Sequence, residues 1–172
     1  MTVQNGATTG FSGSINLPDE AATVNLGQSL AVIATDGDVI LLRGDLGAGK
    51  TALARGLIRH LCGLETEVPS PTFTLLQQYD APLWTIHHFD LYRIAHPDEA
   101  IEIGFEDILG DGLCLIEWPE RLAGWLPSST LSVDLMIDGT GRAAKVRSKS
   151  GAWRERLESS DLWDKLTTDD DA

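Results

Sequence analysis

Apolar residues along the chain follow three patterns, and each pattern predicts an element. Val39–Leu42 is a continuous apolar run, typical of a strand buried on both faces of a parallel sheet. Leucines at helical spacing follow, with Gly63 as the expected C-cap: Leu53, Leu57, Leu61 and Leu64. From Leu131 to Ile137 apolar and polar residues alternate, and Gly139–Gly141 turns the chain into a partner strand that reaches Val146. The patterns predict a buried strand, a helix and a hairpin.

Helices and strands are expected to interleave over the rest of the chain. Further helices are predicted from Pro18–Glu20 to before Gly37, over Pro97–Leu109, and across Trp153, Leu157, Leu162 and Leu166. Further strands are predicted over Thr72–Tyr79, Leu83–Phe89 and Leu113–Trp118. This order implies an α/β sandwich of three layers, in which a mixed sheet carries antiparallel edge strands.

The segment between the first buried strand and the leucine-bearing helix matches G-x-x-x-x-G-K-[ST] without deviation. It runs from Gly44 to Thr51 through Asp45, Leu46, Gly47, Ala48, Gly49 and Lys50. Its glycines let successive backbone N–H groups point into one concavity around phosphates. Lys50 is placed to reach the β- and γ-phosphates, and the Thr51 hydroxyl to ligate Mg²⁺. We predict a P-loop NTPase fold that binds a nucleoside triphosphate at a helix N-terminus.

Two acidic residues end predicted strands and are candidates for the carboxylate that hydrolysis needs near Mg²⁺. Glu117 ends the strand that begins at Leu113, which would place it at the carboxyl edge of the sheet beside the phosphates. The alternative is that Glu117 merely caps that strand. Asp90 ends the preceding strand, and its alternative role is N-cap of the turn Leu91–Arg93.

Four residues complete the catalytic hypothesis, and three of them lie outside the phosphate loop. Thr72 lies in Ser70-Pro71-Thr72, where switch loops of nucleotide hydrolases occur, although this tripeptide is also a common turn. We predict catalytic roles for Lys50, Thr72, Asp90 and Glu117. The predicted metal ligands are Thr51, Glu117 and Asp90.

Several other residues near these segments have two open interpretations. His87 and His88 are adjacent in a predicted strand and point to opposite faces, so we expect one in the core and one at the surface rather than a joint metal site. Trp118 either presents its indole to a partner or packs inside the protein. Arg93 either neutralises phosphate charge or pairs with a nearby acid.

Charge is the unusual part of the composition. Among 172 residues, 26 acidic and 13 basic residues give a net charge of -13. No Lys or Arg precedes Arg43, which argues against a signal or transit peptide. We expect no direct nucleic-acid binding, because an acidic surface repels phosphates. We also expect no membrane span, since no apolar stretch approaches about 18 residues.

Length and cysteine content indicate one intracellular domain. Residues 15–166 are predicted as a single P-loop domain, between a mobile tail over Met1–Ser14 and an acidic tail over residues 167–172. Cys62 and Cys114 lie in apolar segments and are expected to be small core residues, not a disulfide or a metal pair. A reducing, cytoplasmic setting fits these features.

The phosphate loop alone is generic, but further motifs accompany it in a specific order. The blocks are Leu17–Glu20, Gly44–Thr51, Ser70–Leu75, His88–Arg93, Ile116–Pro119 and Gly141–Ala144. In this order they resemble the TsaE family, formerly YjeE, of small bacterial P-loop ATPases. That family assists the biosynthesis of threonylcarbamoyladenosine (t6A) in tRNA. The resemblance covers about Leu17 to Ser150 and leaves both ends of the chain unassigned.

The resemblance implies a cytoplasmic ATPase whose weak turnover rises when it docks on the TsaB–TsaD complex. TsaD holds the metal-dependent transferase site, and tRNA would be met only through these partners. The implied cofactors are ATP and Mg²⁺, with Thr51 and Glu117 holding the ion and Asp90 close by. Thr72 would be the switch-loop residue.

Two more assignments follow from the resemblance, and the second is the weaker. Trp118 would lie at or near the partner surface. Leu17–Glu20 would approach the adenine, which makes Glu20 a candidate cofactor-binding residue.

Three other functions share the phosphate loop. A small-molecule kinase usually needs a lid with several arginines, whereas Arg93 is the only Lys or Arg between Ser70 and Trp118. A GTPase usually carries Asn-Lys-x-Asp, but every asparagine here precedes the phosphate loop. A nucleotide-gated docking module would use ATP binding alone to order the Ser70 loop and the Trp118 surface.

Overall fold

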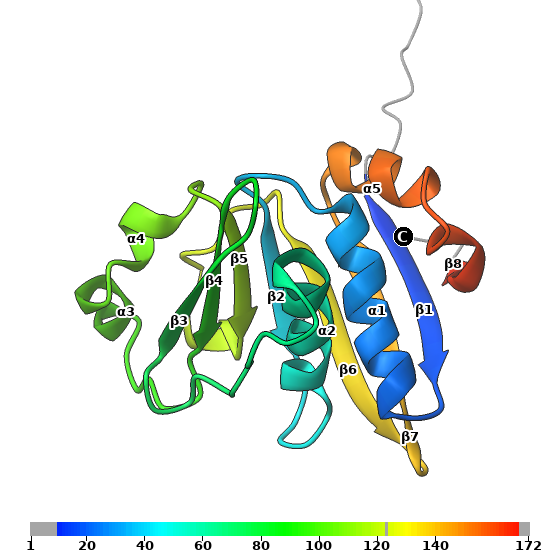
Figure 1. Cartoon of the computed structure of the whole chain (residues 1–172), viewed down its shortest axis with the longest axis horizontal. Coiled ribbons are helices and arrows are strands. Elements are labelled where there is room, and N and C mark those ends of the chain that lie inside the picture. The colour runs from blue at the N-terminus through cyan, green and yellow to red at the C-terminus, as the bar shows by residue number, and fades with distance from the viewer. Residues whose placement is uncertain (1–9, 123, 169–172) are drawn as a thin grey trace, which may run out of the picture.

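A mixed sheet of eight strands runs through the computed structural model, in the order β3-β4-β5-β2-β6-β7-β1-β8 (Figure 1). The structure describes residues 10–122 and 124–168. The strands are β1 Phe11–Leu17, β2 Val39–Arg43, β3 Leu76–Asp80, β4 Thr85–Asp90, β5 Leu113–Glu117, β6 Leu131–Asp138, β7 Gly141–Ser148 and β8 Thr167–Thr168. The central pairs β4–β5, β5–β2 and β2–β6 are parallel, and the outer pairs are antiparallel.

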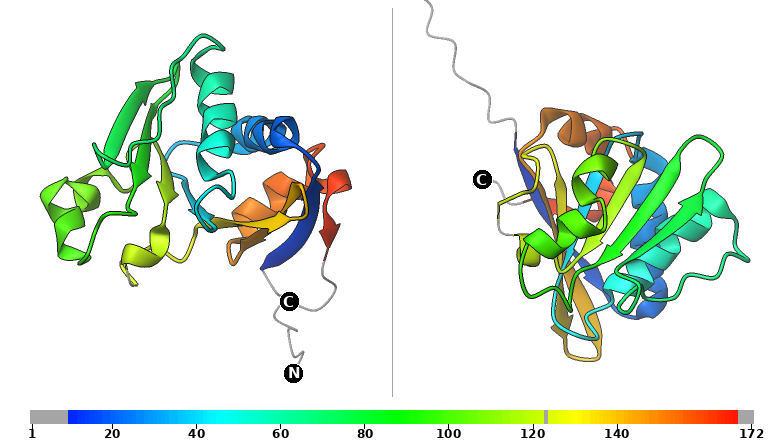
Figure 2. Two further views of the ribbon diagram at one scale, coloured as in Figure 1. Left: turned by 90° about the horizontal axis from the view of Figure 1, so that it is seen from below. Right: turned by 90° about the vertical axis from the view of Figure 1, so that its left-hand side faces the viewer.

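Helices cover the two faces of this sheet unequally. The helices are α1 Glu20–Ile33, α2 Lys50–Cys62, α3 Asp98–Glu102, α4 Phe105–Ile108 and α5 Gly151–Glu158, with 3-10 turns η1 Pro119–Leu122 and η2 Trp163–Lys165. Seen from below, α1 and α2 lie together on one side of the sheet, and α3 and α4 lie on the other (Figure 2). The predicted three-layer P-loop sandwich with antiparallel edges is confirmed.

Alternation along β2 explains how one strand serves both layers. Ile40 and Leu42 belong to the core beneath α1 and α2, whereas Val39 and Leu41 belong to the core beneath α3 and α4. All four side chains are buried. Because both faces of this strand contact an apolar core, each of these four positions takes an apolar residue, and the strand appears in the sequence as a continuous apolar run.

Two glycines let α1 and α2 pack closely. A Cβ added at Gly27 of α1 would lie 2.1 Å from the carbonyl oxygen of Leu53, and one added at Gly56 of α2 would lie 2.1 Å from that of Val24. The start of α1 is fixed by Asp19, whose Oδ1 accepts a hydrogen bond of 2.8 Å from the Ala22 N–H. These contacts hold the N-terminus of α1 beside that of α2.

Several predicted boundaries were wrong because of local backbone geometry. The helix predicted over Pro97–Leu109 is divided into α3 and α4 by Gly104, whose φ is 77°. The strand predicted from Thr72 begins at Leu76, since Leu75 has a φ of 64° and its N–H bonds to the Pro71 carbonyl at 2.7 Å. The last helix ends at Glu158, and η2 follows it.

The predicted ends of the domain also differ from the structure. Phe11–Ser14, assigned to a tail, belong to β1, which pairs with β7. Residues 1–9 of that predicted tail lie outside the described residues. At the other end Thr167 and Thr168 form β8, and residues 169–172 of the predicted acidic tail lie outside the described residues. No helix in the described ranges has both the length and the apolar content needed to cross a bilayer.

Candidate functional site

The phosphate loop joins the end of β2 to the first turn of α2. Its backbone conformation and close contacts require glycine at two positions. Gly44 has a φ of 140°, and a Cβ there would lie 2.5 Å from the Leu135 carbonyl oxygen. Gly49 has a φ of 106° and precedes α2. No side chain in the described part of the chain caps this helix. Its first-turn N–H groups are therefore available to an anionic ligand.

Lys50 is the first residue of α2 and its side chain folds over the loop. Its Nζ donates hydrogen bonds to the carbonyl oxygens of Gly44 at 2.5 Å and Asp45 at 2.9 Å. The Nζ also lies 4.1 Å from the centre of the Trp118 ring. Burial lowers the pKa of Lys50, and the carboxylates of Glu117 and Asp90 partly oppose that shift. The two backbone carbonyls hold an ammonium where a polyphosphate would need it.

The two candidate carboxylates lie side by side at the carboxyl edge of the sheet. Asp90 ends β4 and Glu117 ends β5, and these residues are directly paired in the parallel ladder. Both are buried, with exposed fractions of 3% and 2%. The Thr51 hydroxyl lies 3.0 and 3.2 Å from the two Glu117 carboxylate oxygens. The topology thus brings together three residues that are far apart in the sequence.

Asp90 serves the loop that follows it and the loop that precedes β3 at the same time. Its Oδ1 accepts a 3.0 Å hydrogen bond from the Tyr92 N–H, so it does cap the turn after β4. Its Oδ2 accepts hydrogen bonds from the hydroxyls of Ser70 at 3.0 Å and Thr72 at 2.8 Å. The N-cap role of Asp90 therefore uses one carboxylate oxygen, and the other oxygen holds the hydroxyls of Ser70 and Thr72.

The side chains of Thr51, Asp90 and Glu117 fit Mg²⁺ in chemistry and number. It offers two carboxylates and one hydroxyl, and Mg²⁺ in phosphate-binding sites usually takes one or two carboxylates, substrate phosphates and waters. Among the described residues, no group of three or more His, Cys, Asp or Glu side chains is placed to hold a metal ion by itself. An ion here would share its coordination sphere with a bound phosphate.

Other predicted site residues lie farther from this centre. Leu46 is 65% exposed at the tip of the loop, and Ala48 is buried beneath it. Glu20 is exposed at the start of α1, where its carboxylate lies 3.9 Å from the guanidinium of Arg55. The α1 side chain that approaches the phosphate loop is that of Thr23, whose Cγ2 lies 3.2 Å from the position a Gly49 Cβ would take.

Two residues around the site were missed from the sequence. His88 is fully buried and its Nε2 lies 2.8 Å from Glu117 Oε1. Alternation along β4 places His88 on the same face as Asp90, and this signal could have found it. Arg142 of β7 donates a 2.8 Å hydrogen bond to the Gly47 carbonyl. Nothing in local spacing indicated that contact, because it spans 95 residues.

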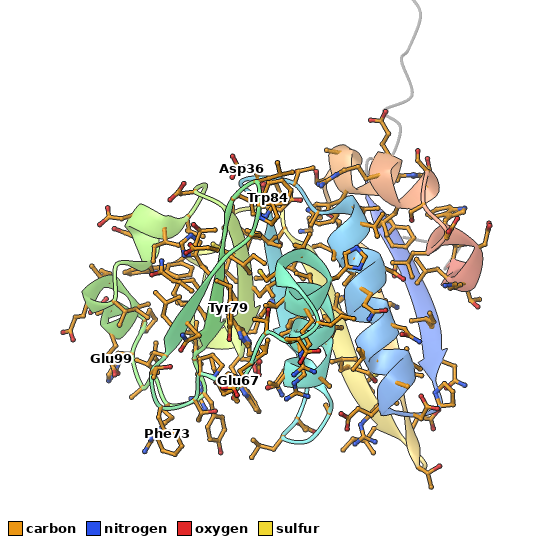
Figure 3. All side chains as sticks on the ribbon, in the orientation of Figure 1. Asp36, Glu67, Phe73, Tyr79, Trp84 and Glu99 are labelled. Carbon is orange, nitrogen blue, oxygen red and sulfur yellow. The ribbon has the colours of Figure 1, made fainter. Side chains whose placement is uncertain are left out.

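The open interpretations of the neighbouring residues have definite outcomes. The expectation of one surface histidine was wrong, since His87 is buried as well. Trp118 is half-buried with a φ of 59°, and its ring lies 4.9 Å from that of Tyr92. The Arg93 guanidinium lies over the ring of Phe73 at 4.7 Å. Phe73 itself is 84% exposed and points away from the body of the molecule (Figure 3). Both cysteines are free thiols.

Comparison with known proteins assigns this geometry to a family. The family model described as "Threonylcarbamoyl adenosine biosynthesis protein TsaE" matches residues 17–145. The tRNA threonylcarbamoyladenosine biosynthesis protein TsaE of Rickettsia typhi is 42% identical over 135 residues, covering 78% of this chain and 94% of that protein. The protein of the same name from Haemophilus influenzae is 39% identical over 125 residues, covering 69% and 78%.

A solved structure agrees with the sequence comparison. The crystal structure of YdiB from Bacillus subtilis matches with a TM-score of 0.70 and 26% sequence identity, covering 86% of this chain and 93% of that chain. The family match contains the phosphate loop and both buried carboxylates. The chain therefore belongs to the TsaE family of P-loop proteins, which take part in the biosynthesis of threonylcarbamoyladenosine in tRNA.

Proposed function

We propose that the protein is an ATP-hydrolysing accessory factor of tRNA t6A modification that acts in the cytoplasm through a TsaB–TsaD complex. The observation that carries the hydrolytic part is the meeting of Thr51, Asp90 and Glu117 beside the phosphate loop. The t6A part rests on the family membership. The net negative charge of the protein supports contact with tRNA through partners rather than directly.

Binding would come first and would use the loop between Asp45 and Thr51. The uncapped amides at the start of α2 would hold the β- and γ-phosphates, and Lys50 would exchange its two backbone carbonyls for phosphate oxygens. Thr51, Glu117 and Asp90 are the residues that would hold Mg²⁺. The ion would neutralise charge that develops on the phosphates during hydrolysis.

Two groups of residues would then position the reacting groups. His88 fixes the Glu117 carboxylate through its Nε2 hydrogen bond, and so acts as a positioning residue. Ser70 and Thr72 hold the loop before β3 against Asp90 by hydrogen bonds. A ligand that bound Asp90 would therefore change the position of this loop. Glu20, near the start of α1, would lie toward the adenine side.

The positions of the nearby arginines, which lie over aromatic rings, support a low intrinsic rate of ATP hydrolysis. Rapid nucleotide hydrolysis commonly needs an arginine that stabilises charge in the transition state. Arg93 stacks on Phe73, and Arg121 lies 6.0 Å from the centre of the Tyr92 ring. A partner that moved Phe73 would release Arg93, and one that moved Tyr92 and the neighbouring Trp118 would release Arg121. These contacts support activation by docking.

The test is ATP hydrolysis by the full chain, measured alone and with purified TsaB–TsaD. We expect slow, Mg²⁺-dependent phosphate release that the complex stimulates. Transfer of the γ-phosphate to a small acceptor would instead indicate a kinase. ATP binding without hydrolysis under either condition would indicate a docking module. Comparable affinities for GTP and ATP would contradict the choice of nucleotide.

A further inference from the structure

Within residues 10–122 and 124–168, one part of the sheet has no helical layer on its second face. α3 and α4 pack against β4, β5 and β2, whereas the described helices that cover β6, β7 and β1 lie on the α1 side (Figure 2). A groove of about 930 Å³ lies over this open face. Leu41 and Arg43 of β2 line one part of it, and the segment from Leu126 to Thr130 lines another.

Charge in this groove is opposite to that of the chain as a whole. Four of its lining residues are basic: Arg43, Lys145, Arg147 and Lys149. They are four of only 13 lysines and arginines in a chain of net charge -13. No described residue that lines the groove is acidic, and five lining residues carry hydroxyl groups. A basic groove on an acidic protein focuses attraction for an anionic partner at one place.

The strand register arranges these cations in rows. Arg43, Asp134, Lys145 and Ser14 form one row across β2, β6, β7 and β1. The next row places Arg147 between Ser132 and Ser12. Hydrogen bonds tie the rows together, since Arg43 donates to the Ser132 hydroxyl at 3.1 Å. Arg147 pairs with Asp134, which lies between Arg43 and Lys145 in the first row, so one carboxylate already stands among these cations.

We propose that this groove binds an extended acidic segment of a protein partner. Lys145 and Arg147 occupy alternate positions of β7, so their spacing along the strand is about 6.7 Å, and Lys149 directly follows the end of that strand. Acidic side chains at alternate positions of an extended peptide have the same spacing. The Asp134–Arg147 pair is an internal example of the contact that such a peptide would make.

The lining of the groove favours a peptide over RNA. Proteins that bind single-stranded nucleic acid combine basic grooves with exposed aromatic rings on which bases stack. Among the described lining residues the one aromatic side chain is Phe11, which is buried. The groove offers charge and hydroxyl groups without a stacking surface, which suits carboxylates on a peptide backbone.

The primary test is fluorescence anisotropy of a fluorescein-labelled peptide of alternating glutamate and alanine, titrated with the full chain without nucleotide. We expect saturable binding that weakens as NaCl rises. The same peptide with glutamine in place of glutamate should not bind. Because this readout needs neither ATP nor a tRNA pathway, its failure would leave the proposed function untouched, and failure of that function would leave this result untouched.

Charge variants distinguish the groove from general attraction. The double variant Lys145→Gln/Arg147→Gln should bind the peptide about tenfold more weakly. The control Arg55→Gln/Lys165→Gln removes the same charge on α2 and η2 and should bind as the wild type does. Asp134→Asn should strengthen binding, because it removes the competing carboxylate. Equal losses in both double variants, with thermal unfolding unchanged, would overturn the proposal.

Two further outcomes would also overturn it. Tighter binding of an oligouridine of matched charge, lost in Lys145→Gln/Arg147→Gln, would assign the groove to RNA. Residues 169–172 read Asp-Asp-Asp-Ala and follow β8, which pairs with β1. If a variant that ends at Thr168 binds the peptide more tightly than Asp134→Asn does, the groove would belong to the chain's own acidic segment.

Discussion

In β5 every residue from Leu113 to Glu117 is buried, whereas in β6 buried and partly exposed residues alternate from Leu131 to Leu135. The first strand lies between two helical layers and the second has a helical layer on one face. Both strands lie directly beside β2, so the phosphate loop stands at the boundary between the two halves.

This difference separates two kinds of chemistry. In the covered half, Glu117, Asp90 and His88 are buried, and each makes a hydrogen bond to another side chain. Charges in such a place interact strongly, because little water screens them. In the open half, charged side chains such as Arg147 keep contact with water, where contacts are weaker and salt-sensitive. The covered half suits a reaction site, and the open half suits reversible docking.

The largest expected effect lies at the boundary, at Lys50. Lys50→Ala should weaken ATP binding by about 100-fold, because a charged hydrogen-bond donor to the phosphates is lost. Isothermal titration calorimetry with Mg–ATP measures this change. Lys165→Ala, an exposed lysine of η2, is the control and should bind normally. Unchanged affinity in Lys50→Ala would contradict the role given to the phosphate loop.

Within the covered half, Glu117→Gln should lower kcat for ATP hydrolysis by about 100-fold while ATP still binds. The substitution keeps the shape of the side chain and removes the charge that would hold Mg²⁺. Asp90→Asn should act in the same direction. Glu106→Gln on α4 is the matched control, since Glu106 is exposed. A Glu117→Gln variant with normal turnover would exclude this carboxylate from the reaction.

The close packing of α1 against α2, the helical layer shared by both halves, depends on Gly56. Gly56→Ala should lower the free energy of unfolding by about 2 kcal/mol, because the added methyl group meets the α1 backbone at Val24. Urea denaturation measures the loss. Val32→Ala on the exposed face of α1 changes side-chain size without such a contact and should alter stability little. Equal stability of Gly56→Ala and wild type would mean that the two helices can separate at little cost.

The burial of Cys114 in β5 should be visible in the pH dependence of the free energy of unfolding. Burial raises the pKa of its thiol from 9.0 to about 12. Because the folded-state pKa is the higher one, the stabilising contribution is complete below pH 9.0 and is lost as pH rises toward 12. Between these values wild type should lose about 1.4 kcal/mol per pH unit more than Cys114→Ala does. Parallel stability curves for the two proteins would show that the thiol is accessible to water.

The smallest effect is expected from the residue that only positions Glu117. His88→Leu should lower kcat about tenfold by releasing the Glu117 carboxylate. His88→Gln keeps a hydrogen-bond donor and should recover part of the activity. Because a purely structural loss would not be rescued in this way, the pair distinguishes positioning from packing. His60→Leu, on the exposed side of α2, is the control.

Local patterns were sufficient where one segment fixes its own structure. The apolar run of β2, the G-x-x-x-x-G-K-[ST] loop and the helix that ends at Gly63 were all predicted where they occur. Breaks inside elements were harder to predict. Gly104 and Leu75 adopt positive φ values that divide or shorten elements, and apolar spacing alone carries no sign of φ.

Contacts between distant segments were not determined by local patterns. β1 was missed because its residues are mostly small and polar, and its structure depends on seven pairs with β7, from Phe11–Ser148 to Leu17–Arg142. The same holds for His88 on Glu117 and for Arg142 on the Gly47 carbonyl. The spacing of each segment is visible in the sequence, but the register between segments is not.

The sequence by itself determined the phosphate loop, the layers of the fold and the acidic residues at the ends of β4 and β5. It did so because periodicity and the Gly44–Thr51 motif act over a few neighbouring residues. Only the tertiary structure decided that Asp90 and Glu117 lie side by side, that His88 holds one of them, and that four cations gather on an open face. Those outcomes depend on strand order and on which faces the helices cover.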